Sequence, residues 1–235
     1  AAYIAEDIFD EDALKEVLVK HQLEYVRTVV PDQNWNELWE SNFEPVVVDG
    51  FCAIRADFHA PFPDKQIEII ITPKMSFGTG HHATTYMMVS EMNKLDFKNK
   101  QVADFGTGTG VLAILAEKLG SAFVWAIDND DWSIENAKEN IVKNNCSKIV
   151  IDKADGFLPR EPFNIILANI NKSIILTHVD GLLFGLTNVA ELLLSGLLKE
   201  DEDDVVGAFK RKGLKHRSTV EKNNWICITL EKVIL

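Results

Sequence analysis

The second part of the chain alternates between short apolar runs and longer segments in which apolar positions recur every three or four residues. Continuous runs of Val, Ile, Leu and Ala are typical of strands buried on both faces of a parallel sheet. We predict such strands over residues 101–105, 123–128, 148–155, 164–170 and 191–198. The helical spacing predicts helices over residues 81–95, 111–120, 131–145, 173–185 and 202–213. This alternation predicts an α/β fold with a doubly wound, mostly parallel sheet.

The chain ends in two more β-rich runs, residues 216–222 and 225–232, separated only by Asn223 and Asn224. Two such residues between strands are typical of a tight hairpin, because asparagine tolerates the left-handed backbone that the turn requires. The hairpin therefore adds a strand that runs against the others.

The first part of the chain has a different pattern. Residues 10–20 predict an amphipathic helix that is opened by acidic side chains. Residues 31–45 indicate a linker or a short irregular element, and β-rich runs follow at 45–50, 51–58 and 67–72.

Length and charge narrow the possible partners. A chain of 235 residues is long enough for one full domain and an appendage. Residues 1–50 contain twelve acidic and three basic side chains, so they carry −9 of the net charge of −12. This charge argues against an extended nucleic-acid surface, where phosphate contacts dominate affinity. The acidic start either maintains solubility or forms an acidic face for a basic partner.

Cysteine usage and hydropathy indicate the compartment. Cys52, Cys146 and Cys227 are widely spaced and form no CxxC pair. This favours reduced thiols in the cytoplasm over a disulfide framework or a zinc cluster. The most apolar stretch, residues 179–198, is interrupted by Asp180 and other polar residues, so we expect no membrane span.

A glycine-rich turn, D-F-G-T-G-T-G at residues 104–110, lies between a predicted strand and a predicted helix. Glycines there let the backbone approach a ligand, and the helix N-terminus offers free N–H groups. The dinucleotide fingerprint spaces its glycines G-x-G-x-x-G, whereas here the spacing is G-x-G-x-G and Val111 follows. Asp128 ends the next strand, 22 residues after Gly106, where a carboxylate accepts both ribose hydroxyls. Together these features indicate an adenosine-containing ligand without a strong pyrophosphate signal.

The glycine-rich turn, Asp128 and the closing hairpin together resemble the class I methyltransferases, which use S-adenosylmethionine. Within that class the chain resembles the PrmA family, which methylates the large-subunit ribosomal protein eleven. The segments that carry this resemblance are residues 75–85 (MSFGTGHHATT), 168–170 (ANI), 194–197 (LSGL), 35–39 (WNELW) and 221–226. The resemblance covers residues 31–235 well and residues 1–30 loosely. It departs from the family pattern at Thr107, where a cysteine is common, and it implies a seven-stranded, Rossmann-like sheet.

The resemblance also implies roles for individual residues. The residues expected to bind S-adenosylmethionine are Thr85, Asp104, Gly106, Gly108, Asp128, Asp155 and Asn169. Gly106 and its neighbours would hold the aminoacyl part of the cofactor, Asp128 its ribose, and Asp155 the adenine edge. Thr85 would hydrogen-bond the cofactor from the opposite wall. Asn169 has a catalytic role as well, because its side-chain carbonyl would orient the incoming amine. Two simpler interpretations remain open, since Asp155 starts an Asp-Gly turn and Asn169 ends a strand.

Methyl transfer to nitrogen needs orientation and a neutral amine. Deprotonating a lysine of ordinary pKa at pH 7 costs about 4.6 kcal/mol, and burial beside apolar residues lowers this cost, so no dedicated base is required. His81 and His82 are adjacent on a predicted helix and therefore point to different faces. Because no third ligand has a suitable spacing, we expect no metal site.

The PrmA resemblance implies two domains. Residues 1–44 would be the remnant of an amino-terminal α+β domain that recognises the substrate, with its linker, and residues 45–235 would be the methyltransferase domain. Roughly the first forty residues of the recognition domain would be missing, as judged from that resemblance. We therefore expect this chain to bind S-adenosylmethionine normally but to methylate its basic ribosomal substrate poorly, with an association that weakens steeply with salt.

We thus predict a cytoplasmic methyltransferase that transfers methyl groups from S-adenosylmethionine to lysine side chains and the amino terminus of a ribosomal protein. One alternative is a class I methyltransferase with a small-molecule or nucleic-acid substrate. Asn169 is followed by Ile170 and Asn171, however, and not by the Pro-Pro-aromatic run of base N-methyltransferases. Two further alternatives are a nicotinamide-dependent oxidoreductase and a non-catalytic interaction protein that retains the fold.

Overall fold

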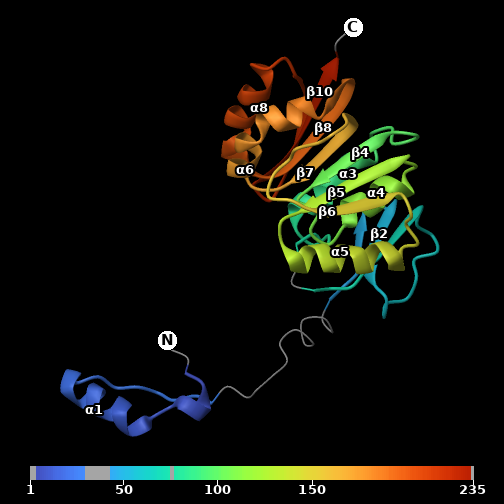
Figure 1. Cartoon of the computed structure of the whole chain (residues 1–235). Helices are drawn as coiled ribbons and strands as arrows, with labels where there is room; N and C mark the ends of the chain where they lie inside the picture. The colour runs from blue at the N-terminus through green and yellow to red at the C-terminus, as the bar shows by residue number, and fades with distance from the viewer. Residues whose placement is uncertain (1–3, 30–42, 75–76, 234–235) are drawn as a thin grey trace. The chain divides into compact units, whose positions relative to one another are not determined.

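The computed structural model describes residues 4–29, 43–74 and 77–233. The predicted linker segment at residues 35–39 lies outside these ranges, as do Met75 and Ser76. The chain divides into two compact units, residues 1–35 and 36–235 (Figure 1). Each unit is described by itself.

The first unit contains the helix predicted over residues 10–20. A short 3-10 turn, Glu6–Ile8, precedes helix α1, Glu11–His21. The side chain of Asp10 caps α1 by accepting a hydrogen bond of 2.9 Å from the Ala13 N–H. Such a cap satisfies one of the free N–H groups of the first turn. No residue of α1 is buried within this unit.

The second unit is built on a seven-stranded sheet with the order β6-β5-β4-β7-β8-β10-β9. Its strands are β4 (Gln101–Phe105), β5 (Phe123–Asp128), β6 (Ile149–Lys153), β7 (Phe163–Asn169), β8 (Leu186–Leu198), β9 (Lys215–Lys222) and β10 (Trp225–Val233). The first five strands in this chain order pair in parallel, whereas β10 pairs antiparallel with β8 and β9. The prediction of a doubly wound, mostly parallel sheet with one reversed strand is confirmed.

Helices cover both faces of this sheet, because successive residues of a strand point to opposite faces. Val102 and Leu167 belong to one apolar core with helices α3 (Ala83–Met92), α4 (Val111–Lys118) and α5 (Asp131–Lys143). Ala103 and Ile166, their chain neighbours, belong to a second core. The helices of that second core are α6 (Lys172–Thr177), α7 (Val179–Phe184) and α8 (Glu202–Lys210), the last preceded by the 3-10 turn Lys199–Asp201. Figure 1 shows α6 and α8 together beside β8 and β10.

A small sheet of three strands, β1 (Val46–Val48), β2 (Cys52–Ala56) and β3 (Ile67–Ile71), adds a further layer. It accounts for the β-rich runs predicted before residue 73. β2 is antiparallel to β1 and parallel to β3, and all five residues of β2 are buried. Ile54, Ile69 and Ile71 share the first apolar core with α3 and α4, so the small sheet covers these helices from outside.

The predicted hairpin is confirmed. Trp225 pairs with Lys222 across Asn223 and Asn224, whose φ angles are 53° and 65°. Two consecutive left-handed residues are what a twisted two-residue hairpin requires.

Two elements differ from the prediction. The helix predicted over 173–185 is two helices, α6 and α7, because the backbone of His178 leaves the helical region at φ −103° and ψ 14°. β8 begins at Leu186 and not at residue 191. Its first half pairs with the far end of β10, where Val233 lies opposite Val189, and this pairing extends the strand.

Among the described residues, no helix is both long enough and apolar enough to span a bilayer.

Candidate functional site

The predicted site residues gather where β4, β5 and β7 end. Phe105, the last residue of β4, lies beside Ile127 of β5 and Ala168 of β7. The chain leaves β4 through α4 toward β5 on one side and later returns to β7 on the other side. Open α/β sheets bind their ligands at such a switch point, beyond the carboxyl ends of the strands. The register therefore brings the glycine-rich turn, Asp128 and Asn169 to one edge.

The glycine-rich turn is held against β5 by its own backbone. The N–H groups of Gly106 and Thr107 both donate to the carbonyl oxygen of Ile127, at 2.9 Å each. Gly106 has a φ of 78°, and a Cβ atom at this position would lie 2.3 Å from Cγ2 of Ile170. Only glycine fits there, because a side chain would meet both backbone strain and a collision.

Asp128 connects the turn to the end of β5. Its Oδ2 accepts a hydrogen bond of 2.9 Å from the Gly108 N–H, and its Oδ1 accepts one of 3.1 Å from the Asp130 N–H. The side chain is half-buried. Each carboxylate oxygen has a second lone pair, so the oriented carboxylate retains the capacity to accept two hydroxyl groups of a ribose.

Asp104 lies fully buried at the carboxyl end of β4. The hydroxyl of Thr107 donates to its Oδ2 at 2.7 Å, whereas its Oδ1 has no hydrogen-bond partner among the described residues. Burial raises the pKa of Asp104 to about 7, and the nearby charge of Asp128 acts in the same direction. The α-ammonium group of S-adenosylmethionine would supply the positive charge that this carboxyl group lacks.

Asn169 and Thr85 meet across the site, although they are 84 residues apart in the chain. The Nδ2 of Asn169 donates to the Thr85 hydroxyl at 3.3 Å, and both residues are buried. This contact turns the carbonyl end of the amide away from α3. Within the described part of the chain, Oδ1 of Asn169 is buried without a hydrogen-bond partner. A buried acceptor of this kind is suited to an N–H donor from a ligand.

Asp155 follows β6 at the same edge and is exposed. The preceding residue, Ala154, donates its N–H to the Asp128 carbonyl oxygen at 3.0 Å, which brings the end of β6 close to the end of β5. Gly156 packs closely against His178, since a Cβ atom there would lie 2.9 Å from Nε2 of that ring. The adenine-edge role of Asp155 remains a prediction.

A segment before α3 lies on the glycine-rich turn, which the sequence did not indicate. The Phe77 carbonyl oxygen accepts from the Thr109 N–H at 3.0 Å, and the Gly78 carbonyl oxygen accepts from the Thr109 hydroxyl at 2.8 Å. A Cβ atom on Gly108, whose φ is 55°, would lie 2.3 Å from the Phe77 oxygen. The close approach explains this second glycine.

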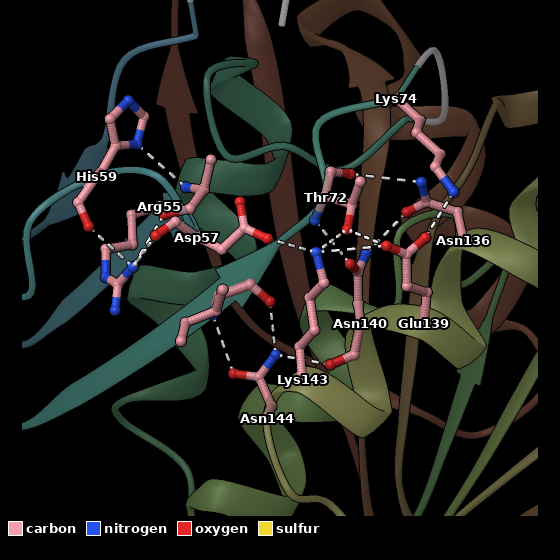
Figure 2. A network of polar contacts seen from close by, with 12 residues as sticks. Arg55, Asp57, His59, Thr72, Lys74, Asn136, Glu139, Asn140, Lys143 and Asn144 are labelled. Atoms are coloured by element: carbon pink, nitrogen blue, oxygen red, sulfur yellow. Dashed lines mark hydrogen bonds and ion pairs between the residues drawn. The ribbon is translucent and has the colours of Figure 1, made fainter.

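A polar network on α5 and its C-cap residue was also missed (Figure 2). Asn136, Asn140 and Asn144 recur every fourth residue and are 1%, 0% and 8% exposed. Their amides bind the backbone of residues 70–72 and of Thr109. The signal was present in the sequence, since three asparagines at core spacing on a predicted helix are polar residues in an apolar stripe.

The remaining candidates for chemistry are the metal-ligating side chains and the cysteine thiols. The described ranges contain no group of three or more His, Cys, Asp and Glu side chains that could hold a metal ion. His82 instead caps α3 by accepting from the Thr84 N–H. Burial raises the pKa of Cys52 to about 12 and that of Cys146 to about 11, so both thiols are protonated at neutral pH.

Comparisons with known proteins agree in one assignment. A family model described as "Ribosomal protein L11 methyltransferase (PrmA)" matches residues 2–233. The ribosomal protein L11 methyltransferase of Phocaeicola vulgatus is 39% identical, over 97% of this chain and 84% of that protein. That of Porphyromonas gingivalis is 42% identical, over 87% of this chain and 72% of that protein.

Solved structures show the same similarity. The crystal structure of ribosomal protein L11 methylase from Lactobacillus delbrueckii subsp. bulgaricus has a TM-score of 0.74 and 27% identity, and the match covers 82% of this chain and all of that one. Precorrin-6y C5,15-methyltransferase from Geobacter metallireducens has a TM-score of 0.54 and 14% identity, over 63% of this chain and 86% of that one, which shows the shared fold alone.

Proposed function

The chain belongs to the family of ribosomal protein L11 methyltransferases, and from this premise we propose that it methylates amino groups of that large-subunit protein with S-adenosylmethionine as donor. The proposed acceptors are lysine side chains and the amino terminus. Residues 45–235 would carry out the transfer, and residues 1–44 would belong to substrate recognition.

The observation that carries the donor assignment is Asp128 at the end of β5, hydrogen-bonded to the Gly108 N–H of the glycine-rich turn. This bond fixes the carboxylate beside a turn whose backbone a ligand can approach closely. The buried, unpartnered Oδ1 of Asp104 supports the same assignment, because it fits a cationic group. When bound, S-adenosylmethionine supplies a methyl group on a sulfonium, whose leaving group needs no protonation.

Asn169 is the proposed orienting residue for the acceptor. Its Nδ2 is held by Thr85, so its Oδ1 is directed by a contact that the ligand does not have to form. An N–H of a neutral amine would donate to Oδ1, and this hydrogen bond would set the direction of the nitrogen lone pair. The amine would lose its proton to water before it is buried, because burial disfavours the charged form of an amine.

The charge of the molecule supports a protein partner. Net charge is −12, which favours a basic protein over a nucleic acid as substrate. We place this reaction in the cytoplasm, in accord with three cysteines that form no disulfide among the described residues.

The direct test is transfer of radiolabelled methyl groups from S-adenosylmethionine to purified ribosomal protein L11, with mass spectrometry of the modified sites. We expect label on lysine side chains or the amino terminus. Calorimetry with S-adenosylmethionine, its homocysteine product and a nicotinamide dinucleotide gives the matched binding controls. Label on another residue type would contradict the amine assignment, and binding of the dinucleotide alone would contradict the whole proposal.

A further inference from the structure

Helix α5 and its C-cap residue, Asn144, bury three asparagines where apolar side chains would be expected. Asparagine is a poor helix former, and a buried amide destabilises the protein unless its donors and acceptor are satisfied. Asn136, Asn140 and Asn144 are nevertheless nearly fully buried, and Figure 2 shows their side chains pointing toward the segment around Thr72. Their hydrogen bonds identify two different tasks.

One task is to cover the free edge of the small sheet. β3 is the edge strand of that sheet, so its outward N–H and C=O groups need partners other than a strand. Asn144 accepts from the Ile70 N–H at 3.0 Å and donates to the Ile70 oxygen at 2.6 Å. Its Nδ2 also donates to the Asn140 carbonyl oxygen of α5, at 2.8 Å. In the described part of the chain, the side chain of Asn144 thus hydrogen-bonds only Ile70 and Asn140, and not the glycine-rich turn.

Asn140 has a second task. Its Oδ1 accepts from the Thr72 N–H at 2.7 Å, which continues the edge cover. Its Nδ2 donates to the Thr109 carbonyl oxygen at 2.8 Å, and also to Oδ1 of Asn136 at 2.8 Å. One amide thus joins the end of β3 to the glycine-rich turn.

Thr109 is consequently held from two sides. Asn140 binds its carbonyl oxygen, while Phe77 and Gly78 bind its N–H and its hydroxyl. Thr109 is fully buried, and none of these partners belongs to the turn itself. Thr109 is therefore held in place by elements outside the turn.

We propose that Asn140 is a positioning residue for the cofactor-binding turn, which it holds in its binding conformation through the Thr109 carbonyl oxygen. The proposal rests on the proposed function, because it assigns the turn to S-adenosylmethionine. Asn140 acts through Thr109 and does not itself touch the cofactor.

An ion-pair shell around the same segment is the competing explanation. Lys143 donates to Asp57 and to the Thr72 hydroxyl at 2.7 Å each, and Glu139 pairs with Lys74 at 2.6 Å (Figure 2). These side chains are partly exposed, so each ion pair contributes little to the stability of the fold. None of these ion pairs contacts the glycine-rich turn, and Glu139→Gln is therefore a control for the shell alone.

The test compares Asn140→Ala with Asn144→Ala. Both changes remove a buried amide that covers the β3 edge, so both should lower the free energy of unfolding in urea. Only Asn140→Ala should weaken the binding of S-adenosylmethionine, with a Kd that rises by about tenfold or more when it is measured by calorimetry. We expect Asn144→Ala and Glu139→Gln to stay within about threefold of the unaltered chain. The KM for the cofactor should rise in Asn140→Ala, while kcat at saturating cofactor changes much less.

Asn140→Leu removes the donated hydrogen bond without adding a charge, and it serves if the alanine variant does not fold. Leucine is branched at Cγ like asparagine and favours the helix, but it has no N–H for Thr109, so the loss of affinity should persist. Unchanged affinity in Asn140→Leu, or equal losses in the Asn140 and Asn144 variants, would overturn the positioning role alone. Failure of the unaltered chain to bind S-adenosylmethionine would overturn the proposed function, and the positioning role with it.

Discussion

Asp104 and Asn169 each bury a side-chain oxygen without a hydrogen-bond partner among the described residues. An unsatisfied buried polar group costs about 1–3 kcal/mol, so two of them near the carboxyl ends of neighbouring strands require an explanation. Both lie on adjacent strands, β4 and β7, at the edge where ligands of α/β sheets bind. The cost is understandable if a ligand supplies the missing partners.

Asp128 should contribute to S-adenosylmethionine binding in two ways. Asp128→Ala removes the proposed acceptor for the ribose and also the contact with the Gly108 N–H. We expect S-adenosylmethionine affinity to fall by about 1.5–3 kcal/mol, the range for hydrogen bonds to a charged group. Calorimetry measures this directly, with Asp203→Ala, at an exposed position of α8, as a comparison. Unchanged affinity in Asp128→Ala would remove it from the ribose role.

Asn169 should matter for turnover more than for binding. Asn169→Ala removes the proposed acceptor for the amine, so kcat should fall by about tenfold or more, or 1.4 kcal/mol, with a smaller change in cofactor Kd. Thr85→Val keeps Asn169 but releases its Nδ2, and should give an intermediate loss. Equal losses in kcat and in cofactor affinity would instead make Asn169 a cofactor-binding residue.

Asp104 should make the free protein less stable as pH rises. Its pKa is raised from 3.8 to about 7, so the folded state holds the proton more tightly than the unfolded chain. Its burial has no ionisation cost below about pH 4, the cost grows as pH rises to about 7, and it is constant above that value. The total is a few kcal/mol, at roughly 1.4 kcal/mol per pKa unit.

Asp104→Asn should remove this decrease of the free energy of unfolding with rising pH, which is the pH slope of stability. Urea unfolding at pH 5 and pH 8 would show a smaller pH-dependent loss in the variant than in the unaltered chain. Asp155→Asn, at an exposed position, should leave the slope as it is. A variant slope equal to that of the unaltered chain would show that Asp104 does not cause it.

At the scale of elements, polar backbone groups decide which segments lie together. The edge of β3 is covered by amides of α5, and the turn after β4 is covered by Phe77 and Gly78. The hairpin of β9 and β10 depends on a local device, two asparagines in the left-handed region. Substituting glycine there relieves strain without touching the site.

Asn224→Gly should therefore stabilise the protein. Asn-Gly is the preferred pair for this turn, and the gain should be about 0.4–1 kcal/mol in the free energy of unfolding. Asn224→Ala should destabilise it, since alanine is strained at a φ of 65°. Urea unfolding of both variants gives the result, and stabilisation by alanine would contradict the turn assignment.

At the scale of the whole molecule, we expect electrostatic attraction to contribute to association with the ribosomal substrate. Net charge is −12, and most of it is carried by residues 1–50. Attraction between exposed charges is screened within about 8–10 Å at physiological ionic strength. The affinity for the protein substrate should therefore decrease with salt concentration far more than the affinity for the cofactor.

Raising NaCl should increase the KM for ribosomal protein L11 while the KM for S-adenosylmethionine changes little. The cofactor KM is the internal control, since both constants come from the same enzyme at each salt concentration. A substrate KM that does not respond to salt would show that the acidic residues serve solubility and not recognition.

Much of the fold follows from local patterns. The strands 101–105 and 123–128 were predicted to the residue, because their apolar runs end at the glycine-rich turn and at Asp128. The Asn223-Asn224 turn set the hairpin in the same local way. The candidate residues Gly106, Gly108 and Asp128 also came from the turn motif and its spacing, and the parallel register of β4 and β5 places them together.

Other features depend on partners that are distant in the chain. The early start of β8 arises from its pairing with β10, which apolar periodicity does not encode. The break at His178 lies in the local backbone, but apolar periodicity does not encode it either. The contact of Asn169 with Thr85 spans 84 residues, and that of Asn140 with Thr109 spans 31. Hydrophobic spacing reports only which face of an element is buried, since burial is non-directional. Hydrogen bonds are directional and need both partners in place, so the pairing of each buried amide was decided by the packed tertiary structure.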